Sequence, residues 1–140
     1  MRWTVLATKA QTASWATPQH VYETLDKEFG FTLDPCPLGA EGGLFGSSDG
    51  LLCKWAGQRV YCNPPYGLGI GEWLARAQEA DLAVFLLPAR TDTRWWHQYA
   101  PRAQEVRFVR GRLRFGDGRN SAPFPSVILV FKPEKTEVTP

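Results

Sequence analysis

Four consecutive residues, Asn63 to Tyr66, read Asn-Pro-Pro-Tyr, directly after a short apolar run and before two glycines and a helical pattern. The Asn63 side-chain oxygen and the Pro64 carbonyl can each accept a hydrogen bond from a planar amino group. Such bonds draw the nitrogen toward tetrahedral geometry and point its lone pair at a methyl donor. Because proline fixes φ, Pro64 and Pro65 hold that carbonyl in place, while the Tyr66 ring offers a flat face for a base. The motif indicates methylation of an amino group, although the same residues also occur in ordinary turns.

The surrounding pattern is that of an α/β fold. The predicted strands cover residues 31–34, 60–62, 82–87, 106–109 and 127–131. The predicted helices cover residues 18–29, 70–77 and 93–99, with Thr17 and Asp92 as N-caps. Strands that alternate with helices imply a mainly parallel sheet with helices on both faces. Ligands of such sheets bind beyond the carboxyl ends of the strands, so we expect Asp34, Asn63 and Arg90 to meet at one edge.

Length and composition set the class of protein. The chain has 140 residues, which suits one domain with a core, and its 44% hydrophobic and 21% charged residues are typical of a soluble globular protein. We expect a flexible arm over 1–13, a single domain over 14–132 and a flexible tail over 133–140. No apolar stretch is long enough to cross a membrane, and no signal peptide is evident, which favours a cytosolic protein.

Two loops and three cysteines complete the pattern. Residues 39–50 are rich in glycine and serine and read as a loop, as do residues 111–125. Cys36, Cys53 and Cys62 are too widely spaced for a zinc site, and their odd number argues against a disulfide framework. We expect them to be buried thiols.

Positive charge is concentrated in about one fifth of the chain, residues 90–119. Residues 90–119 contain eight arginines and three acidic residues, whereas residues 1–89 contain six basic and nine acidic residues. Such a stretch can bind phosphates, or it can be a solvated face. Phe115 and Phe124 flank an arginine-rich loop, where they can stack an extruded base or simply pack beneath the loop. The Trp95-Trp96 pair is more typical of a helix core than of a base platform.

Several further motifs occur in order along the chain. They are Trp15-Ala16-Thr17-Pro18, Glu28-Phe29-Gly30-Phe31-Thr32-Leu33-Asp34-Pro35-Cys36, Asp49-Gly50-Leu51, Trp55, Cys62-Asn63-Pro64-Pro65-Tyr66-Gly67, Trp73, Leu87-Pro88-Ala89-Arg90-Thr91-Asp92-Thr93, Trp95-Trp96-His97 and Gly111-Arg112-Leu113-Arg114-Phe115. This series resembles the phage-type DNA N6-adenine methyltransferase family, often called Dam-like. The resemblance runs from about Ser14 to Phe131, and it is specific because separate blocks agree in order and spacing.

The resemblance implies a reduced Rossmann-like fold that transfers a methyl group from S-adenosylmethionine (SAM) to adenine N6 in DNA. It implies direct transfer without a metal, in the cytoplasm of a phage-infected or prophage-carrying bacterial host. The implied catalytic residues are Asn63, Pro64, Pro65 and Tyr66. The implied cofactor-binding residues are Thr17, Pro18, Asp34, Pro35, Cys36 and Asp49. The implied substrate-binding residues are Arg90, Arg112, Arg114, Phe115 and Arg119.

The chain departs from the usual pattern in two ways, and other functions stay open. It lacks the glycine-rich cofactor turn of typical SAM enzymes, and it has no segment for a separate target-recognition domain, which leaves the 111–125 loop to provide any sequence specificity. Methylation of cytosine N4, of an RNA base or of a protein glutamine would use the same acceptors. A catalytically inactive DNA-binding module is a further alternative, and the arginines favour nucleic acid over protein.

Overall fold

A computed structural model of the chain describes residues 16–36, 47–67, 69–116 and 118–134. The arm expected over 1–13 and most of the expected tail lie outside these ranges. The described helices are α2 (Gln19–Phe29), α3 (Ser47–Leu52), α4 (Ile70–Ala77), α5 (Arg94–Tyr99) and the short 3₁₀ helix η2 (Ala100–Arg102). Within the described ranges, no helix combines the length and the apolar character needed to span a membrane.

In the described part of the chain, four strands form one mixed sheet in the order β1-β2-β4-β3. The strands are β1 (Arg59–Cys62), β2 (Leu82–Pro88), β3 (Glu105–Phe108) and β4 (Ser126–Phe131). β1 and β2 are parallel and are joined through α4. β4 lies between β2 and β3 and runs antiparallel to both. The expected strand over 31–34 is reduced to a parallel bridge between Leu33 and Val60.

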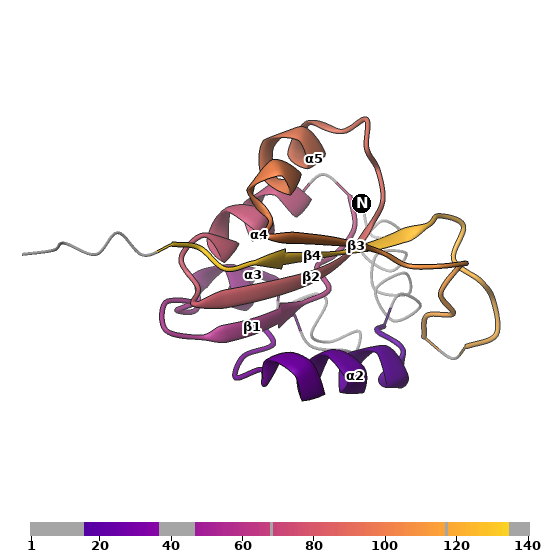
Figure 1. Cartoon of the computed structure of the whole chain (residues 1–140), viewed down its shortest axis with the longest axis horizontal. Coiled ribbons are helices and arrows are strands. Elements are labelled where there is room, and N and C mark those ends of the chain that lie inside the picture. The colour runs from indigo at the N-terminus through magenta and orange to yellow at the C-terminus, as the bar shows by residue number, and fades with distance from the viewer. Residues whose placement is uncertain (1–15, 37–46, 68, 117, 135–140) are drawn as a thin grey trace, which may run out of the picture.

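The mixed sheet corrects the expectation of a mainly parallel one. Parallel neighbours need a crossover that carries the chain back along the sheet. The connection from β3 to β4 instead stays at one end of the sheet, so the chain returns beside β3 in the opposite direction (Figure 1). Because β4 is antiparallel to both of its neighbours, β3 still points the same way as β1 and β2.

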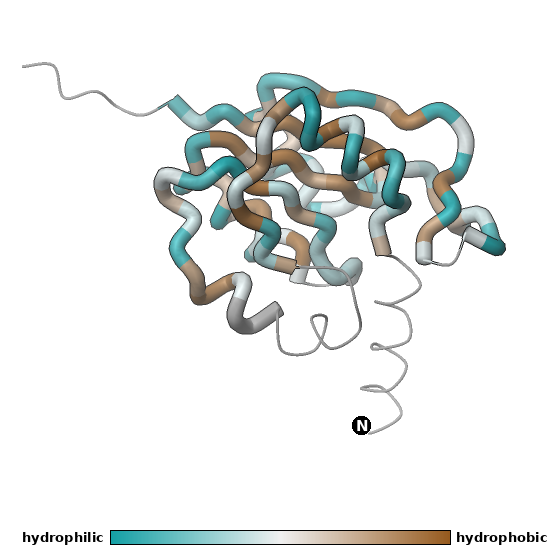
Figure 2. The backbone as a smooth tube through the Cα atoms, turned by 90° about the horizontal axis from the view of Figure 1, so that it is seen from below, coloured by the Kyte–Doolittle hydropathy of each residue, from teal (hydrophilic) through white to brown (hydrophobic). Residues whose placement is uncertain are grey.

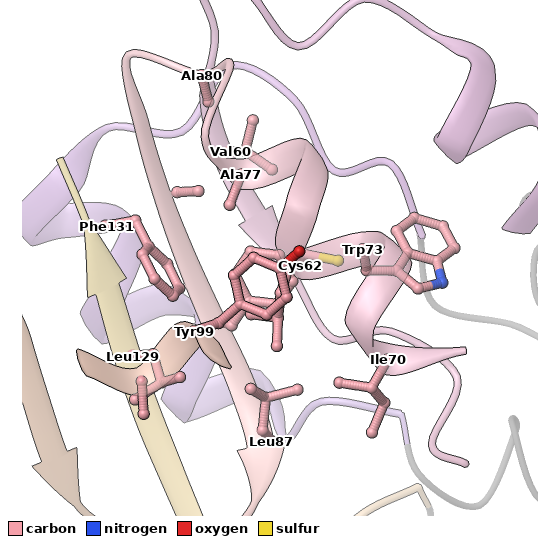
Figure 3. Close-up of a cluster of buried hydrophobic side chains, with 14 of the residues drawn as sticks. Val60, Cys62, Ile70, Trp73, Ala77, Ala80, Leu87, Tyr99, Leu129 and Phe131 are labelled. Carbon is pink, nitrogen blue, oxygen red and sulfur yellow. The ribbon is translucent and has the colours of Figure 1, made fainter. Parts of the chain in front are cut away.

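Helices cover both faces of the sheet, as the sequence predicts (Figure 1). α2 packs on one face through Leu25 and Phe29, in a cluster that includes Tyr61. α4 and α5 pack on the other face, in a cluster that includes Cys62 and Trp73 (Figure 3). Neighbouring residues of β1 therefore point to opposite faces. β2 and β4 are buried along their whole lengths, and Figure 2 shows hydrophobic segments running through the middle of the molecule.

The helix ends show where local signals held and where they did not. Gly30 ends α2 in the left-handed conformation, with φ of 64°, as its position predicts. Thr17 does not cap α2, because Pro18 takes the N-cap position and no side chain caps the helix. In α5 the cap is Thr93 rather than Asp92, and its hydroxyl accepts a hydrogen bond from the Trp96 amide at 3.3 Å.

Helix α3 corrects part of the loop expected over 39–50; residues 39–46 lie outside the described ranges. A Cβ atom on Gly50 would lie 2.1 Å from the Pro35 carbonyl oxygen, so only glycine allows this close approach. The Gly50 carbonyl also accepts a hydrogen bond from the buried Trp55 indole at 2.8 Å. This glycine serves close packing rather than a flexible turn, and it holds α3 against the segment that follows Leu33.

The cysteines are free thiols. Cys36 and Cys62 are buried, which confirms the expectation for these two, whereas Cys53 is only partly buried. Burial raises the pKa of the Cys36 thiol to about 12, with a smaller contribution from Asp34. Burial also raises the pKa of the Cys62 thiol. Cys36 and Cys62 therefore stay protonated at neutral pH and act as packing groups.

Candidate active site

The Asn63–Tyr66 turn starts where β1 ends, at an edge shared by three parallel segments. Leu33 pairs with Val60, and Cys62 pairs with Phe85 in the parallel ladder of β1 and β2. The chain segments that follow these strands therefore leave the sheet at the same edge. This register places Asp34 and Asn63 at one edge of the sheet, as the sequence predicts, and Arg90 follows β2 there.

The side chain of Asn63 is held by a residue far away in the sequence. Its Nδ2 donates a hydrogen bond to the Thr17 hydroxyl at 3.1 Å. The same hydroxyl lies 2.7 Å from the Tyr61 hydroxyl. Tyr61 and Asn63 are two residues apart at the end of β1, which puts both on the face that α2 covers. Thr17, which lies two residues before α2, thus bonds to both of them.

Tyr66 lies where the two hydrophobic clusters meet, and its ring is fixed by its neighbours. Its ring centre is 6.4 Å from that of Phe115 and 5.5 Å from that of Phe124, both in edge-to-face contacts. Its hydroxyl donates a hydrogen bond to the Leu86 carbonyl at 3.3 Å. Phe115 and Phe124 are both buried, so each packs beneath the loop between β3 and β4.

Asp34 is a partly buried carboxylate in a tight turn. The Cys36 amide donates a hydrogen bond to its Oδ1 at 3.1 Å. Burial outweighs this bond and raises the pKa of Asp34 to about 6. The Pro35 backbone that follows packs against Gly50 of α3. This contact brings the turn beside the helix that contains Asp49, whose side chain lies outside the described residues.

A pocket of about 770 Å³ opens beside the turn, toward α5. It is lined by Tyr66, Gly67, Ile70, Gly71, Arg90, Thr93, Arg94, Trp95, Gln98, Pro123 and Phe124. The Arg90 guanidinium lies 5.8 Å from the centre of the Phe124 ring. The pocket therefore combines aromatic surfaces with two arginines, which is a composition suited to a base and its phosphate. Of the two loop phenylalanines, Phe124 lines this pocket, whereas Phe115 contacts Tyr66 and is not part of the lining.

Three other arginines of the basic stretch, Arg107, Arg112 and Arg114, differ in what their side chains contact. Arg112 donates to the Ala122 carbonyl at 3.2 Å, and Arg114 donates to the Arg119 carbonyl at 3.1 Å, so these contacts brace the exposed loop. A guanidinium has five donors, which leaves capacity for phosphate. Arg107 differs, because it forms a two-pronged ion pair with Glu28 of α2, with distances of 2.6 and 2.7 Å.

Sequence reasoning missed two groups of residues that belong to this site. Tyr61 was a strand residue in the prediction, yet its hydroxyl reaches Thr17; its place two residues before Asn63 is the signal that puts both on one face. Trp95 was expected in the core; it is only partly buried against the core cluster, and it also lines the pocket together with Arg94 and Gln98. No sequence pattern marks these α5 residues as part of a pocket, because the pocket depends on how α5 packs.

These features describe an α/β protein with an Asn-Pro-Pro-Tyr turn at the end of a strand, beside an aromatic, basic pocket. A family model described as DNA N-6-adenine-methyltransferase (Dam) matches residues 6–139, nearly the whole chain. The chain belongs to this family, which confirms the resemblance: it is an enzyme that methylates N6 of adenine in DNA. Comparisons with curated proteins and with solved structures each returned no match.

Proposed function

We propose that this enzyme takes its methyl group from SAM and holds the target adenine with the Asn63–Tyr66 turn. The observation that carries the proposal is the hydrogen bond of 3.1 Å between Asn63 and Thr17. It joins the residue assigned to the amino group to the segment assigned to the cofactor. Two roles that must meet in one reaction are thereby assigned to side chains in direct contact.

The turn provides the acceptors for the reaction. Asn63 Oδ1 and the Pro64 carbonyl each accept one N–H of the adenine amino group, which frees the nitrogen lone pair from the ring. Pro64 is buried and Pro65 is partly buried, so packing and fixed φ angles hold the carbonyl in place. Tyr66 stacks the base. Catalysis then depends mainly on positioning, without a covalent intermediate.

The residues assigned to the cofactor fit a cationic ligand. When bound, SAM supplies an electrophilic methyl group on a positively charged sulfur. Within the described residues, the Cys36 amide is the one group that stabilises the Asp34 carboxylate against burial. A cationic group nearby would stabilise it further. The cofactor site would be formed by Thr17, Pro18, Asp34, Pro35, Cys36 and Asp49. The turn that begins at Asp34 and packs on α3 would take the place of a glycine-rich turn.

DNA would bind on the side of the turn that faces α5 and the loop between β3 and β4. Methylation requires the adenine to leave the base stack, and the pocket beside Tyr66 offers an aromatic environment for it. The phosphates would be bound by Arg90 and Arg94 at the pocket and by Arg112, Arg114 and Arg119 in the loop. Phe115 would act indirectly, by packing against Tyr66. The working unit would be the domain over 14–132, in the cytoplasm of a phage-infected or prophage-carrying bacterium.

Radiolabelled methyl transfer tests the proposal directly. The protein is incubated with methyl-labelled SAM and, in parallel, with mixed-sequence DNA, total RNA or total protein. We expect label in DNA, and after digestion to nucleosides in N6-methyldeoxyadenosine. Label in cytosine, in RNA or in protein would contradict the proposed substrate. Absence of transfer, with tight SAM binding retained, would contradict the proposed role of the turn.

A further inference from the structure

We propose that Tyr61 and Thr17 form a relay that fixes which edge of the Asn63 amide faces the substrate. They would be positioning residues, since they act through Asn63 and do not contact the reacting atoms. The inference rests on the proposed role of Asn63. It goes beyond that role because it explains how one of two nearly identical amide orientations is selected.

The relay consists of two hydrogen bonds that share one hydroxyl. Thr17 Oγ1 lies 2.7 Å from the Tyr61 hydroxyl and 3.1 Å from Asn63 Nδ2. Tyr61 is only 1% exposed, and its ring is held by Tyr22 and Phe31, with ring centres 5.2 and 5.4 Å away. Burial raises the pKa of Tyr61, so the phenol stays neutral. The far end of the relay is therefore a rigid, uncharged group.

The position of Thr17 supports a task other than helix capping. Threonine before proline is a strong helix-start signal. Here α2 begins at Gln19 without any side-chain cap, and the Thr17 hydroxyl instead points to Tyr61 and Asn63. The structure thus forgoes an available stabilising interaction at the helix end and places this hydroxyl at the active site.

The donors and acceptors of the Thr17 hydroxyl explain which orientation of the Asn63 amide the relay selects. A threonine hydroxyl has one proton and two acceptor lone pairs. Either hydroxyl could be the donor in the 2.7 Å contact between Thr17 and Tyr61. In the proposed relay Thr17 donates its proton to the Tyr61 oxygen, and it then faces Asn63 with a lone pair only. A lone pair attracts Asn63 Nδ2 and repels Asn63 Oδ1, which fixes the amide with Nδ2 toward Thr17. Oδ1 then lies on the other edge, where the adenine amino group needs an acceptor. A reversed amide would present N–H groups to an N–H donor.

Three substitutions test the relay. Tyr61→Phe removes the acceptor for the Thr17 proton, so Thr17 can donate to Asn63 Oδ1 and the amide can reverse. We expect kcat to fall roughly 10- to 100-fold, by analogy with the loss of a hydrogen-bond partner that orients a metal ligand. The KM for DNA and the Kd for SAM should stay near wild type. Thr17→Val should act similarly on kcat, and Thr17→Ser, which keeps the hydroxyl, should recover most of the loss.

A matched control and a spectroscopic readout separate the relay from general damage. Tyr22→Phe removes a hydroxyl from the same aromatic cluster, outside the relay, and should retain wild-type kcat. In ¹⁵N–¹H spectra, the Asn63 side-chain amide should shift in Tyr61→Phe and Thr17→Val but not in Tyr22→Phe.

Some results would overturn the relay while leaving the proposed function intact. If Asn63→Ala abolished transfer but Tyr61→Phe kept wild-type kcat, Asn63 would be oriented in some other way. If Thr17→Ser were as slow as Thr17→Val, the hydroxyl would not be the active feature. If the Tm, the SAM Kd and kcat of Tyr61→Phe all worsened together, its role would be structural only. An active Asn63→Ala would instead refute the proposed function itself.

Discussion

The two sides of the Asn63–Tyr66 turn are built differently. Toward α2, the polar groups are few and are buried or partly buried, and they bond to one another: Thr17 joins Tyr61 to Asn63, and Asp34 sits in a closed turn. Toward α5 and the loop between β3 and β4, the polar groups are mostly arginines, exposed around aromatic side chains such as Phe124.

Because of this difference, the α2 side should act through the positions of its polar groups, and the α5 side through its net charge. Buried polar groups depend on exact hydrogen-bond geometry and on protonation, and salt screens them weakly. Exposed arginines depend on net charge, tolerate small displacements and respond strongly to salt. Substitutions on the α2 side should therefore change turnover and pH dependence, whereas substitutions on the α5 side should change DNA affinity and its salt dependence.

The largest effect is expected at Asn63, where the two sides meet. Asn63→Ala removes one of the two acceptors for the adenine amino group. Loss of one positioned group in an oxyanion hole costs about 10²–10³ in kcat, and we expect at least this here. SAM binding, followed by calorimetry, should be largely retained, and the thermal unfolding profile should be close to wild type. Turnover near wild type would show that the turn does not hold the amino group.

Tyr66 should follow, with a contrast between its ring and its hydroxyl. Tyr66→Ala removes a stacking surface worth roughly 1–3 kcal/mol per base, and also the edge contacts to Phe115 and Phe124. Tyr66→Phe keeps the ring and loses only the bond of 3.3 Å to the Leu86 carbonyl. We expect Tyr66→Ala to reduce kcat/KM for DNA about 10- to 100-fold, and Tyr66→Phe far less. Equal losses would show that the hydroxyl is what matters.

Much of the fold could be predicted from the sequence, because its signals are local. The apolar face of α4 and the continuous apolar run of β2 follow directly from residue periodicity, and Gly30 marks a helix end. The mixed sheet could not be predicted in this way. Strand direction depends on where the connection from β3 to β4 leads, and loop composition does not encode that path.

The site was predictable to the same extent. The groups proposed to hold the amino group are consecutive residues, Asn63–Tyr66, so the sequence alone suggests them. The family resemblance assigned Thr17 to the cofactor, which stays a prediction. Its helix-start signal predicted a cap, whereas the structure shows a contact with Asn63. Trp95 has a core-like pattern, and only the packing of α5 shows that it lines the pocket.

On the α2 side, Asp34 should make the stability of the protein depend on pH. Its pKa is raised from 3.8 to about 6, so the folded protein binds its proton more strongly than the unfolded chain does. The stability from this group is present below about pH 4 and is lost as pH rises toward 6. Asp34→Asn stays neutral and should therefore be more stable than wild type at pH 8, by at most ~3 kcal/mol, with a smaller gain at pH 5. Denaturant unfolding at both pH values measures this.

The same substitution, Asp34→Asn, should weaken SAM binding. It would thus raise the stability of the folded protein while lowering its affinity for the cofactor. If the carboxylate meets a cationic group of the cofactor, SAM affinity of the wild type should rise with pH through about 6, because only the ionised form pairs with it. Asp34→Asn should bind SAM more weakly and without this pH dependence. Calorimetric titrations at pH 5 and pH 8 compare the two proteins. Identical affinities at both pH values would leave Asp34 as a turn residue only.

The smallest single effects are expected from the loop arginines on the α5 side. If Arg112, Arg114 and Arg119 contact phosphates, each substitution to Ala should reduce the slope of log affinity against log salt by up to about one unit. SAM affinity should stay unchanged. Arg107→Ala is the matched control, since it removes an equal charge from a residue already paired with Glu28. Its DNA salt slope should equal that of wild type, even though losing the ion pair between β3 and α2 lowers stability. If the three loop variants kept the wild-type slope, as Arg107→Ala is expected to do, the loop would be a solvated face and DNA would be held at the pocket alone.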